Sequence, residues 1–238
     1  MSIINITEKE QNQANLYYLQ SSLSELLINT RCGVEEISDE KRIKLKINCL
    51  EQYQDIVRAE ICDKVSEIIV IKYKYEYFKS RLNVGGLSEE EREILLTSLI
   101  AADLDDDKRY TLSRLKEFDE ITVDGIYNFR LKPLRDKWTD IISYMPPYFL
   151  SGQLKDFVTY LIENKKKRVY IEKEKVYDCH FRRLRRSSLL AGEELKIIRE
   201  VLLSNCGEVE IKGSLPESDE KYIKEFYGDK IYFSTGCY

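Results

Sequence analysis

Residues 168–181 read RVYIEKEKVYDCHF, and here the sequence changes from helical to strand-like spacing. Valine, isoleucine and tyrosine alternate with charged residues, which is typical of strands with one buried face. We expect strands at 168–172 and 175–181, a helix at 193–203, a strand at 209–212, a helix at 219–226 and a last strand at 230–234. This order predicts a small α+β unit over residues 165–238, whose boundary lies in the basic run 164–167.

Residues 49–164 predict a helical domain. Only four prolines and ten glycines occur in the whole chain, which favours long helices over many short strands. Apolar spacing predicts one long helix, straight or kinked, over about 49–82. Ser88 and Glu91 form a capping box that opens a helix through 95–100. We expect the run Asp103–Asp107 to interrupt it, with further helices at about 110–118, 129–144 and 148–163. The fold class is therefore mostly α with a small C-terminal α+β unit, α+β overall.

The first segment, residues 1–48, predicts a helix followed by a hairpin. Thr7 is the expected cap, because Glu8 and Glu10 favour the positive end of a helix dipole. Residues 34–37 and 41–47 flank the polar turn 38–40 and predict a short hairpin with Ile43, Leu45 and Ile47 on one face. A continuation of the next helix is the competing interpretation of this segment.

Composition indicates a folded globule with a charged surface, because 43% of residues are apolar and 34% are charged. The net charge of −4 gives no global basic excess for nucleic acid and no extreme acidity. No apolar stretch approaches the ~20 residues of a bilayer helix, and the first residues lack the pattern of a signal peptide. We therefore expect a cytoplasmic protein.

Six cysteines, at 32, 49, 62, 179, 206 and 237, contain no Cys-x-x-Cys pair, so we expect buried or incidental thiols. Cys179 is adjacent to the single histidine, His180. If both lie in a strand, their side chains point to opposite faces and make a poor metal pair.

Three stretches carry a family resemblance: YKYEYF at 73–78, LSEEEREILLTSLIAADLDDDKRY at 87–110, and DGIYNFRL at 124–131, which is followed by Lys137–Trp138 and Pro146–Pro147. Together they resemble the YtxC-like family of sporulation proteins from endospore-forming bacteria, over roughly residues 68–181. The resemblance implies a cytoplasmic protein of a spore-forming cell. It implies no reaction, and it does not reach residues 1–49.

The strongest local charge is basic. Residues 165–186 hold ten bases and three acids, a formal +7, with aromatic residues between the bases. Aromatic residues beside arginines resemble the platforms on which single-stranded nucleic acid stacks, and the bases would contact phosphates. A solvated surface, an acidic protein surface (the chain's own or a partner's) and anionic lipid are the competing interpretations. The candidate residues are Lys165, Lys166, Lys167, Arg168, Arg182, Arg183, Arg185 and Arg186.

Two polar clusters are weaker candidates. Asp103, Asp105 and Asp106 could hold Mg²⁺ for phosphodiester hydrolysis, although the aspartates of the run 103–107 are also favoured at helix starts. Asp124, Asn128 and Arg130 bunch in an expected turn, where they could serve a site or bond the turn's own backbone and a nearby acid.

Chemical motifs are otherwise lacking in the sequence: it has no Gly-rich phosphate loop, no Gly-x-Ser-x-Gly and one histidine. We therefore expect no cofactor and no catalytic residue. The sequence favours a non-enzymatic, sporulation-associated binding protein that contacts nucleic acid through its C-terminal unit. A metal-dependent phosphodiesterase or nuclease and a structural protein–protein adaptor are the alternatives. The partner, the oligomeric state and the sporulation stage stay open.

Overall fold

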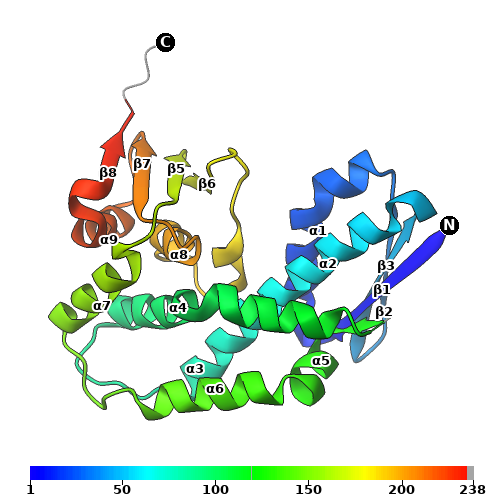
Figure 1. Ribbon diagram of the computed structural model, residues 1–238, viewed down its shortest axis with the longest axis horizontal. Coiled ribbons are helices and arrows are strands. Elements are labelled where there is room, and N and C mark those ends of the chain that lie inside the picture. Colours follow the sequence, from blue (N-terminus) through cyan, green and yellow to red (C-terminus); the bar gives the residue numbers. More distant parts are fainter. Residues whose placement is uncertain (119, 235–238) are drawn as a thin grey trace. The chain divides into compact units, whose positions relative to one another are not determined.

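A computed structural model describes residues 1–118 and 120–234, so Cys237 lies outside the described residues. The fold is α+β, with two four-stranded sheets among these residues. The chain divides into two compact units (Figure 1). Unit 1 comprises Met1–Lys74 and Asp105–Asp140, and unit 2 comprises Tyr75–Leu104 and Ile141–Tyr238. Each unit holds one of the two sheets.

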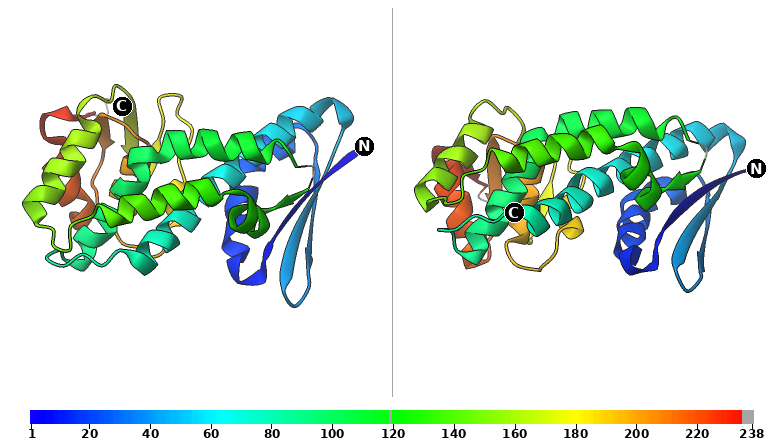
Figure 2. Two further views of the ribbon diagram at one scale, coloured as in Figure 1. Left: turned by 60° about the horizontal axis from the view of Figure 1, so that its bottom comes forward. Right: turned by 90° about the horizontal axis from the view of Figure 1, so that it is seen from below.

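Unit 1 is built on strands β1 (Ser2–Lys9), β2 (Gly33–Ser38), β3 (Arg42–Cys49) and β4 (Ile121–Thr122), in the order β2-β3-β1-β4. The hairpin β2–β3 confirms the prediction from the alternating isoleucines and leucine, with Ile43, Leu45 and Ile47 buried on one face. Helix α1 (Gln13–Asn29) lies along that face, and no helix in the described part of this unit covers the other (Figure 2).

The first strand was missed. Thr7 was expected to cap a helix, but it lies within β1 and pairs with Lys44 of β3 and Thr122 of β4. Ile4 and Ile6 alternate with polar residues and are buried. Pairing with β3 therefore lets these two isoleucines enter the core, which outweighs the local resemblance of Thr7–Glu10 to a helix start.

The predicted long helix is present as α2 (Gln54–Glu67), a π-helical segment (Ile68–Tyr73) and α3 (Lys74–Arg81). Four consecutive branched residues, Ile68–Ile71, are all buried, so the helix is enclosed on every side at this point. A π segment carries more than 3.6 residues per turn and shifts the buried face between the two α-helical parts.

The capping box is confirmed at the start of α4 (Glu89–Leu115), where Glu91 N donates to Ser88 Oγ (3.2 Å) and Ser88 N donates to Glu91 Oε2 (2.8 Å). The expected interruption at Asp103–Asp107 is wrong, because α4 runs through it without a break. The aspartates are therefore helix-interior residues and not caps.

Three further helices follow: α5 (Val123–Arg130), α6 (Lys132–Ser143) and α7 (Ser151–Glu163). The helix predicted at 129–144 is present as α6, and its first two residues belong instead to the end of α5; the two helices are separated at Leu131, just before Lys132–Pro133. Proline lacks an N–H and restricts the residue before it, so a helix start fits this position better than a helix interior.

Unit 2 ends in the predicted order of elements: β5 (Arg168–Glu172), β6 (Lys175–Tyr177), α8 (Lys196–Leu203), β7 (Glu208–Lys212), α9 (Glu217–Tyr227) and β8 (Ile231–Phe233). The sheet order is β6-β5-β7-β8, with β5, β7 and β8 parallel and β6 antiparallel. One face buries Val169, Ile171, Val176, Val209 and Ile211. In the described part of the chain, α4 is the longest helix and none is apolar enough along its length to cross a bilayer.

Candidate nucleic-acid interface

The outer face of the unit 2 sheet is the site that the sequence predicted most directly. Strand alternation places Arg168, Tyr170 and Glu172 of β5 on the face opposite the buried valines and isoleucine. The register adds residues from the neighbouring strands. We call this surface the outer face; its members are Arg168, Tyr170, Glu172, Lys175, Tyr177, Glu208, Glu210, Lys212 and Tyr232.

An aromatic stack stands on the outer face. The rings of Tyr170 and Phe181 are stacked, with centroids 4.8 Å apart and planes 27° apart. Phe181 is 69% exposed although it is apolar, and its φ of 57° lies in the left-handed region. A bulky residue in this conformation has a strained backbone, so other contacts of the loop must hold it in place.

A short turn after β6 holds Phe181 in place. Asp178 Oδ1 accepts hydrogen bonds from the backbone N–H groups of His180 (2.8 Å) and Arg182 (2.9 Å), and Phe181 N donates to the Asp178 carbonyl. Cys179 and His180 therefore lie in a turn and not in a strand. Their side chains meet, with Cys179 Sγ 3.4 Å from His180 Nδ1, so the expectation that they point to opposite faces does not apply.

Two arginines flank the stack. The bridge between Tyr177 and Arg183 is antiparallel, and directly paired residues share a face, so Arg183 belongs to the Tyr177 side of the sheet. Arg182 and Arg183 are both exposed. Neither side chain has an ion pair within the described ranges 1–118 and 120–234. Their positive charges are therefore available to a phosphate.

Arg168 is engaged within the fold. Its guanidinium lies 2.7 Å from Glu208 and 3.3 Å from Glu210, and it stacks over the Tyr232 ring at 4.2 Å. The hydrogen bond to Glu208 is the main reason that the pKa of Arg168 is raised. Lys212 likewise pairs with Glu172 at 3.0 Å. On the outer face, the positive charges of Arg168 and Lys212 are thus neutralised by neighbouring glutamates. The positive charge expected from the sequence is therefore larger than the charge that this face presents.

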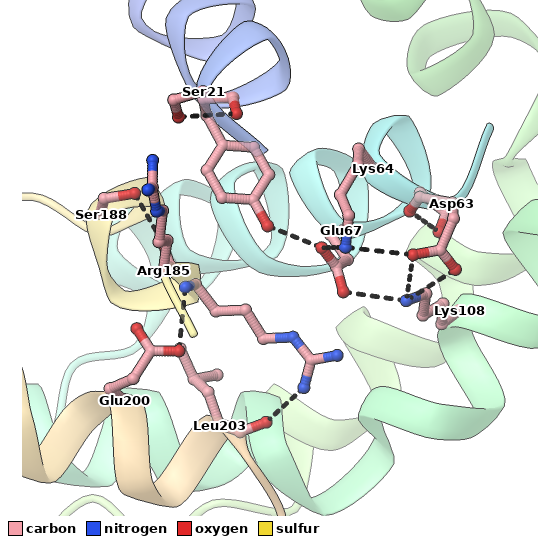
Figure 3. A network of polar contacts seen from close by, with 12 residues as sticks. Ser21, Asp63, Lys64, Glu67, Lys108, Arg185, Ser188, Glu200 and Leu203 are labelled. Atoms are coloured by element: carbon pink, nitrogen blue, oxygen red, sulfur yellow. Dashed lines mark hydrogen bonds and ion pairs between the residues drawn. The ribbon is translucent and has the colours of Figure 1, made fainter. Parts of the chain in front are cut away.

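The two ends of the predicted basic block have different roles. Lys166 and Lys167 are exposed before β5, and Lys165 is half-buried. Arg186 instead donates from Nη1 to the carbonyl of Leu203, the last residue of α8 (3.0 Å). Figure 3 draws this bond as the dashed line that ends at the labelled Leu203. Cations are favoured at this negative end of a helix, so Arg186 serves the fold.

Glu200 anchors the same segment from α8. Its buried carboxylate accepts hydrogen bonds from the backbone N–H groups of Arg186 (2.9 Å) and Ser187 (2.7 Å), and Arg185 accepts one from Ser188 through its carbonyl (Figure 3). Burial raises the pKa of Glu200 in spite of these bonds. Arg185 and Arg186 are both half-buried, which leaves Arg182 and Arg183 as the exposed part of this arginine cluster.

The acidic candidates are spread around one helix. Asp105 and Asp106 are neighbours in α4 and therefore point about 100° apart, and Asp103 lies two residues before Asp105, about 200° around the axis. Asp106 pairs instead with Arg109 at 3.3 Å on the surface. Among the described residues, no group of three histidine, cysteine, aspartate or glutamate side chains could hold a metal ion. Asp103 and Asp106 are three residues apart and share one side of α4, but Asp105 points away from both, so the three carboxylates do not converge.

Asp107, the last aspartate of the run 103–107, is buried in a network of hydrogen bonds. It is 1% exposed and accepts hydrogen bonds from Lys74 Nζ (2.7 Å), Lys137 Nζ (2.8 Å) and Trp138 Nε1 (2.9 Å). Burial alone would raise its pKa, but the Lys74 charge and these hydrogen bonds hold the pKa below its ordinary value. Asp107, Lys74 and Trp138 are buried and Lys137 is half-exposed, so this cluster contributes mainly to the structure of unit 1.

The polar turn candidates lie in a helix. Asp124 is in the first turn of α5, is buried, and pairs with Arg42 through both carboxylate oxygens (2.9 and 3.3 Å). Asn128 is half-buried, and Arg130 lies over the Phe118 ring at 5.4 Å. The expected turn at Asp124–Gly125 is therefore wrong, and Asp124 joins α5 to the sheet of unit 1.

Several buried charges of unit 1 were missed from the sequence. Glu67 of α2 accepts hydrogen bonds from Tyr18 (2.6 Å), Lys64 (3.0 Å) and Lys108 (2.9 Å), as Figure 3 shows. Lys74 was missed as well, although its spacing from Ile71 and Phe78 placed it in a buried row. Charged residues at apolar helical spacing were the signal that could have revealed such clusters.

Comparisons with known proteins found no match: no family model, no curated protein and no solved structure matches this chain. The arrangement of the residues is therefore the basis for any function. The outer face offers stacking surfaces, and the neighbouring Arg182 and Arg183 have no ion pair with another described residue, an arrangement that suits recognition of a planar, anionic ligand.

Proposed function

We propose that this chain is a non-enzymatic, sporulation-associated binding protein of endospore-forming bacteria that contacts single-stranded nucleic acid through the outer face of the unit 2 sheet. The sporulation assignment rests on the YtxC-like stretches at 73–78, 87–110 and 124–131. The binding mode rests on one observation above the others. The exposed Tyr170–Phe181 stack stands beside Arg182 and Arg183, whose side chains have no ion pair in the described part of the chain.

Stacking explains why the aromatic residues are exposed. A base presents an apolar face to a ring, and such contacts are worth about 1–3 kcal/mol per base. Phe181 leaves most of its ring in water in the unbound protein, and Tyr232 is 41% exposed at the far side of the face. Phosphates linking stacked bases would then meet Arg182, Arg183 and, before β5, Lys166 and Lys167.

Charge sets the expected strength of binding. The ion pairs of Arg168 and Lys212 leave few free cations on the outer face, so we expect a small number of phosphate contacts. Each phosphate contact contributes a slope of about −0.7 to the dependence of log K on log salt for single strands. Removing two contacts should therefore reduce that slope by about 1.4.

The test compares charge-reversed and matched control variants. Fluorescein-labelled 20-nucleotide single strands of DNA and RNA are titrated with the full chain at several KCl concentrations. R182E/R183E should weaken binding and flatten the salt slope. The control K155E/R109E changes the net charge equally at two exposed positions outside the outer face and should leave binding nearly unchanged.

A second variant separates stacking from charge. Phe181→Ala removes the exposed ring and keeps both arginines, so we expect a loss of about 1–3 kcal/mol with an unaltered salt slope. Circular dichroism confirms that each variant is folded. Equal affinity of the wild type, R182E/R183E and F181A at low salt would refute the proposed function.

A metal-dependent phosphodiesterase finds no comparable support. It would need Asp103, Asp105 and Asp106 to converge on one ion, and Asp105 points away from the side of α4 that carries the other two.

A further inference from the structure

The sheet of unit 1 ends in an open strand. β2 is the outermost strand in the order β2-β3-β1-β4, and within the described residues no strand pairs with its outer side. All six residues of β2 are exposed, so no element among the described residues of unit 1 buries this strand. Such an edge carries unpaired N–H and C=O groups and can template a further strand.

The hydrogen-bond pattern shows which groups are free. Asp39 N donates to Arg42 O, so the backbone groups of Arg42 bond toward β2. Glu10 N donates to Lys41 O, so the carbonyl of the preceding residue bonds toward β1. Because bonding positions alternate along an antiparallel ladder, the backbone N–H and C=O groups of Gly33, Glu35 and Ile37 point toward β3. The N–H and C=O groups of Val34, Glu36 and Ser38 therefore face outward.

Acidic side chains accompany these free groups. The stretch 33–40, GVEEISDE, holds four acids and no base, and every one of its residues is exposed. Glu35 pairs with Lys46 at 3.0 Å. Glu36 contacts only the amide of Gln13 at 3.4 Å within the described residues. Asp39 accepts backbone hydrogen bonds from Lys41 and Arg42, whose positive charges lie nearby. Glu36 and Glu40 therefore remain the acids of this stretch without an ion pair among the described residues.

The same charges decide between possible occupants. A second copy of β2 paired antiparallel through the same outward groups would place Glu36 opposite Glu36, or Glu35 opposite Glu35 in the neighbouring register, and like charges directly opposite are destabilising. Charged residues at edges also prevent pairing with neutral, aggregation-prone strands. A strand with basic residues would instead gain ion pairs together with the backbone bonds, and the exposed Val34 and Ile37 would contact its apolar residues.

We propose that β2 is a docking edge for an extended, basic segment of a partner protein, which adds as a fifth strand to the sheet of unit 1. The bonds join the outward backbone groups of Val34, Glu36 and Ser38, and the acids at 35, 36, 39 and 40 select lysine or arginine. This site lies in unit 1 and is independent of the outer face in unit 2.

The probe is a synthetic peptide, acetyl-TKVKVKT-amide, titrated against the full chain by isothermal calorimetry and by NMR. Two peptides serve as controls: the acidic analogue TEVEVET, and TKVKVKT with every second backbone nitrogen methylated. The methylated peptide keeps its charge but loses the N–H groups of its pairing edge. We expect binding of the parent peptide alone, with slowed amide exchange at Val34, Glu36 and Ser38.

Protein variants complete the test. Ser38→Pro removes one outward N–H at a position where an edge strand tolerates proline, and it should weaken binding at least fivefold. Glu36→Lys should weaken it at least tenfold. Glu25→Lys makes the same charge change on an exposed residue of α1 outside the strand and should have little effect. Binding of the methylated peptide as tightly as the parent, or no binding of either, would overturn the docking edge. Loss of binding in E25K equal to that in E36K would do the same.

Discussion

Replacing Asp107 by alanine should destabilise the protein by about 3–5 kcal/mol, the cost of breaking a buried ion pair by removing one partner. Lys74 is fully buried and its Nζ lies 2.7 Å from Asp107 Oδ2, so the variant leaves the ammonium group without its nearest anion. Trp138 also loses the acceptor of its indole N–H. The adjacent Asp106 provides the matched control.

Asp106 is 71% exposed at its side chain and pairs with Arg109, which is 79% exposed. Surface pairs of this kind contribute about 0–1 kcal/mol, so Asp106→Ala should be nearly neutral. Urea unfolding followed by circular dichroism at 222 nm measures both variants under one condition. The pair of substitutions K74M/D107L removes both charges together and should be much less destabilising than D107A alone.

The pH dependence follows from the lowered pKa of Asp107. A carboxyl group whose pKa is depressed by folding stabilises the folded state above its ordinary pKa of 3.8, and this contribution is lost as pH falls through the folded value. The difference in unfolding free energy between the wild type and D107A should stay constant from pH 8 to about 5 and shrink below about 4. A D107A variant no less stable than D106A, or a double variant as unstable as D107A, would refute the buried ion pair as a source of stability.

Two other substitutions test single positions. Gly207→Ala should lower the stability of the protein by about 2 kcal/mol or more in thermal unfolding, because its new Cβ would overlap the carbonyl of Lys165. Gly152→Ala is the control: its new Cβ would have no neighbour within 4 Å, so it should be neutral or stabilising by up to about 1 kcal/mol. Burial raises the pKa of Glu8, so its ionised form is penalised at neutral pH and the penalty is relieved as pH falls through that raised pKa. Relative to the non-titrating Glu8→Gln variant, the wild type should therefore gain stability between pH 7 and pH 4.5 in urea titrations, and a constant difference would contradict the burial effect.

Much of the secondary structure could be predicted because its signals are local. The capping box of Ser88 and Glu91 acts across three residues, and the alternation in 168–172 repeats every two. The order of elements in the C-terminal part of unit 2 followed from such signals. In β1, the local signals favoured a helix, and pairing with β3 decided otherwise.

The candidate site was only partly predictable. Its residues were visible as a basic and aromatic run, but the ion pairs of that run join positions far apart in the chain. Arg168 meets Glu208 and Glu210 only because β5 and β7 are neighbours in the sheet, about forty residues apart in sequence. Sequence spacing could therefore not separate the engaged Arg168 from the exposed Arg182 and Arg183.

The sequence by itself determined where helices and strands form in the C-terminal part and which faces are apolar, because hydrophobic periodicity and capping act over a few neighbouring residues. Only the tertiary structure decided which charges are neutralised and which remain exposed. It turned the aspartate run into a helix interior with Asp107 buried beside Lys74, and it left β2 open at the edge of its sheet. The physical reason is that ion pairs and strand pairs depend on distances in space, which the chain sets only when it folds.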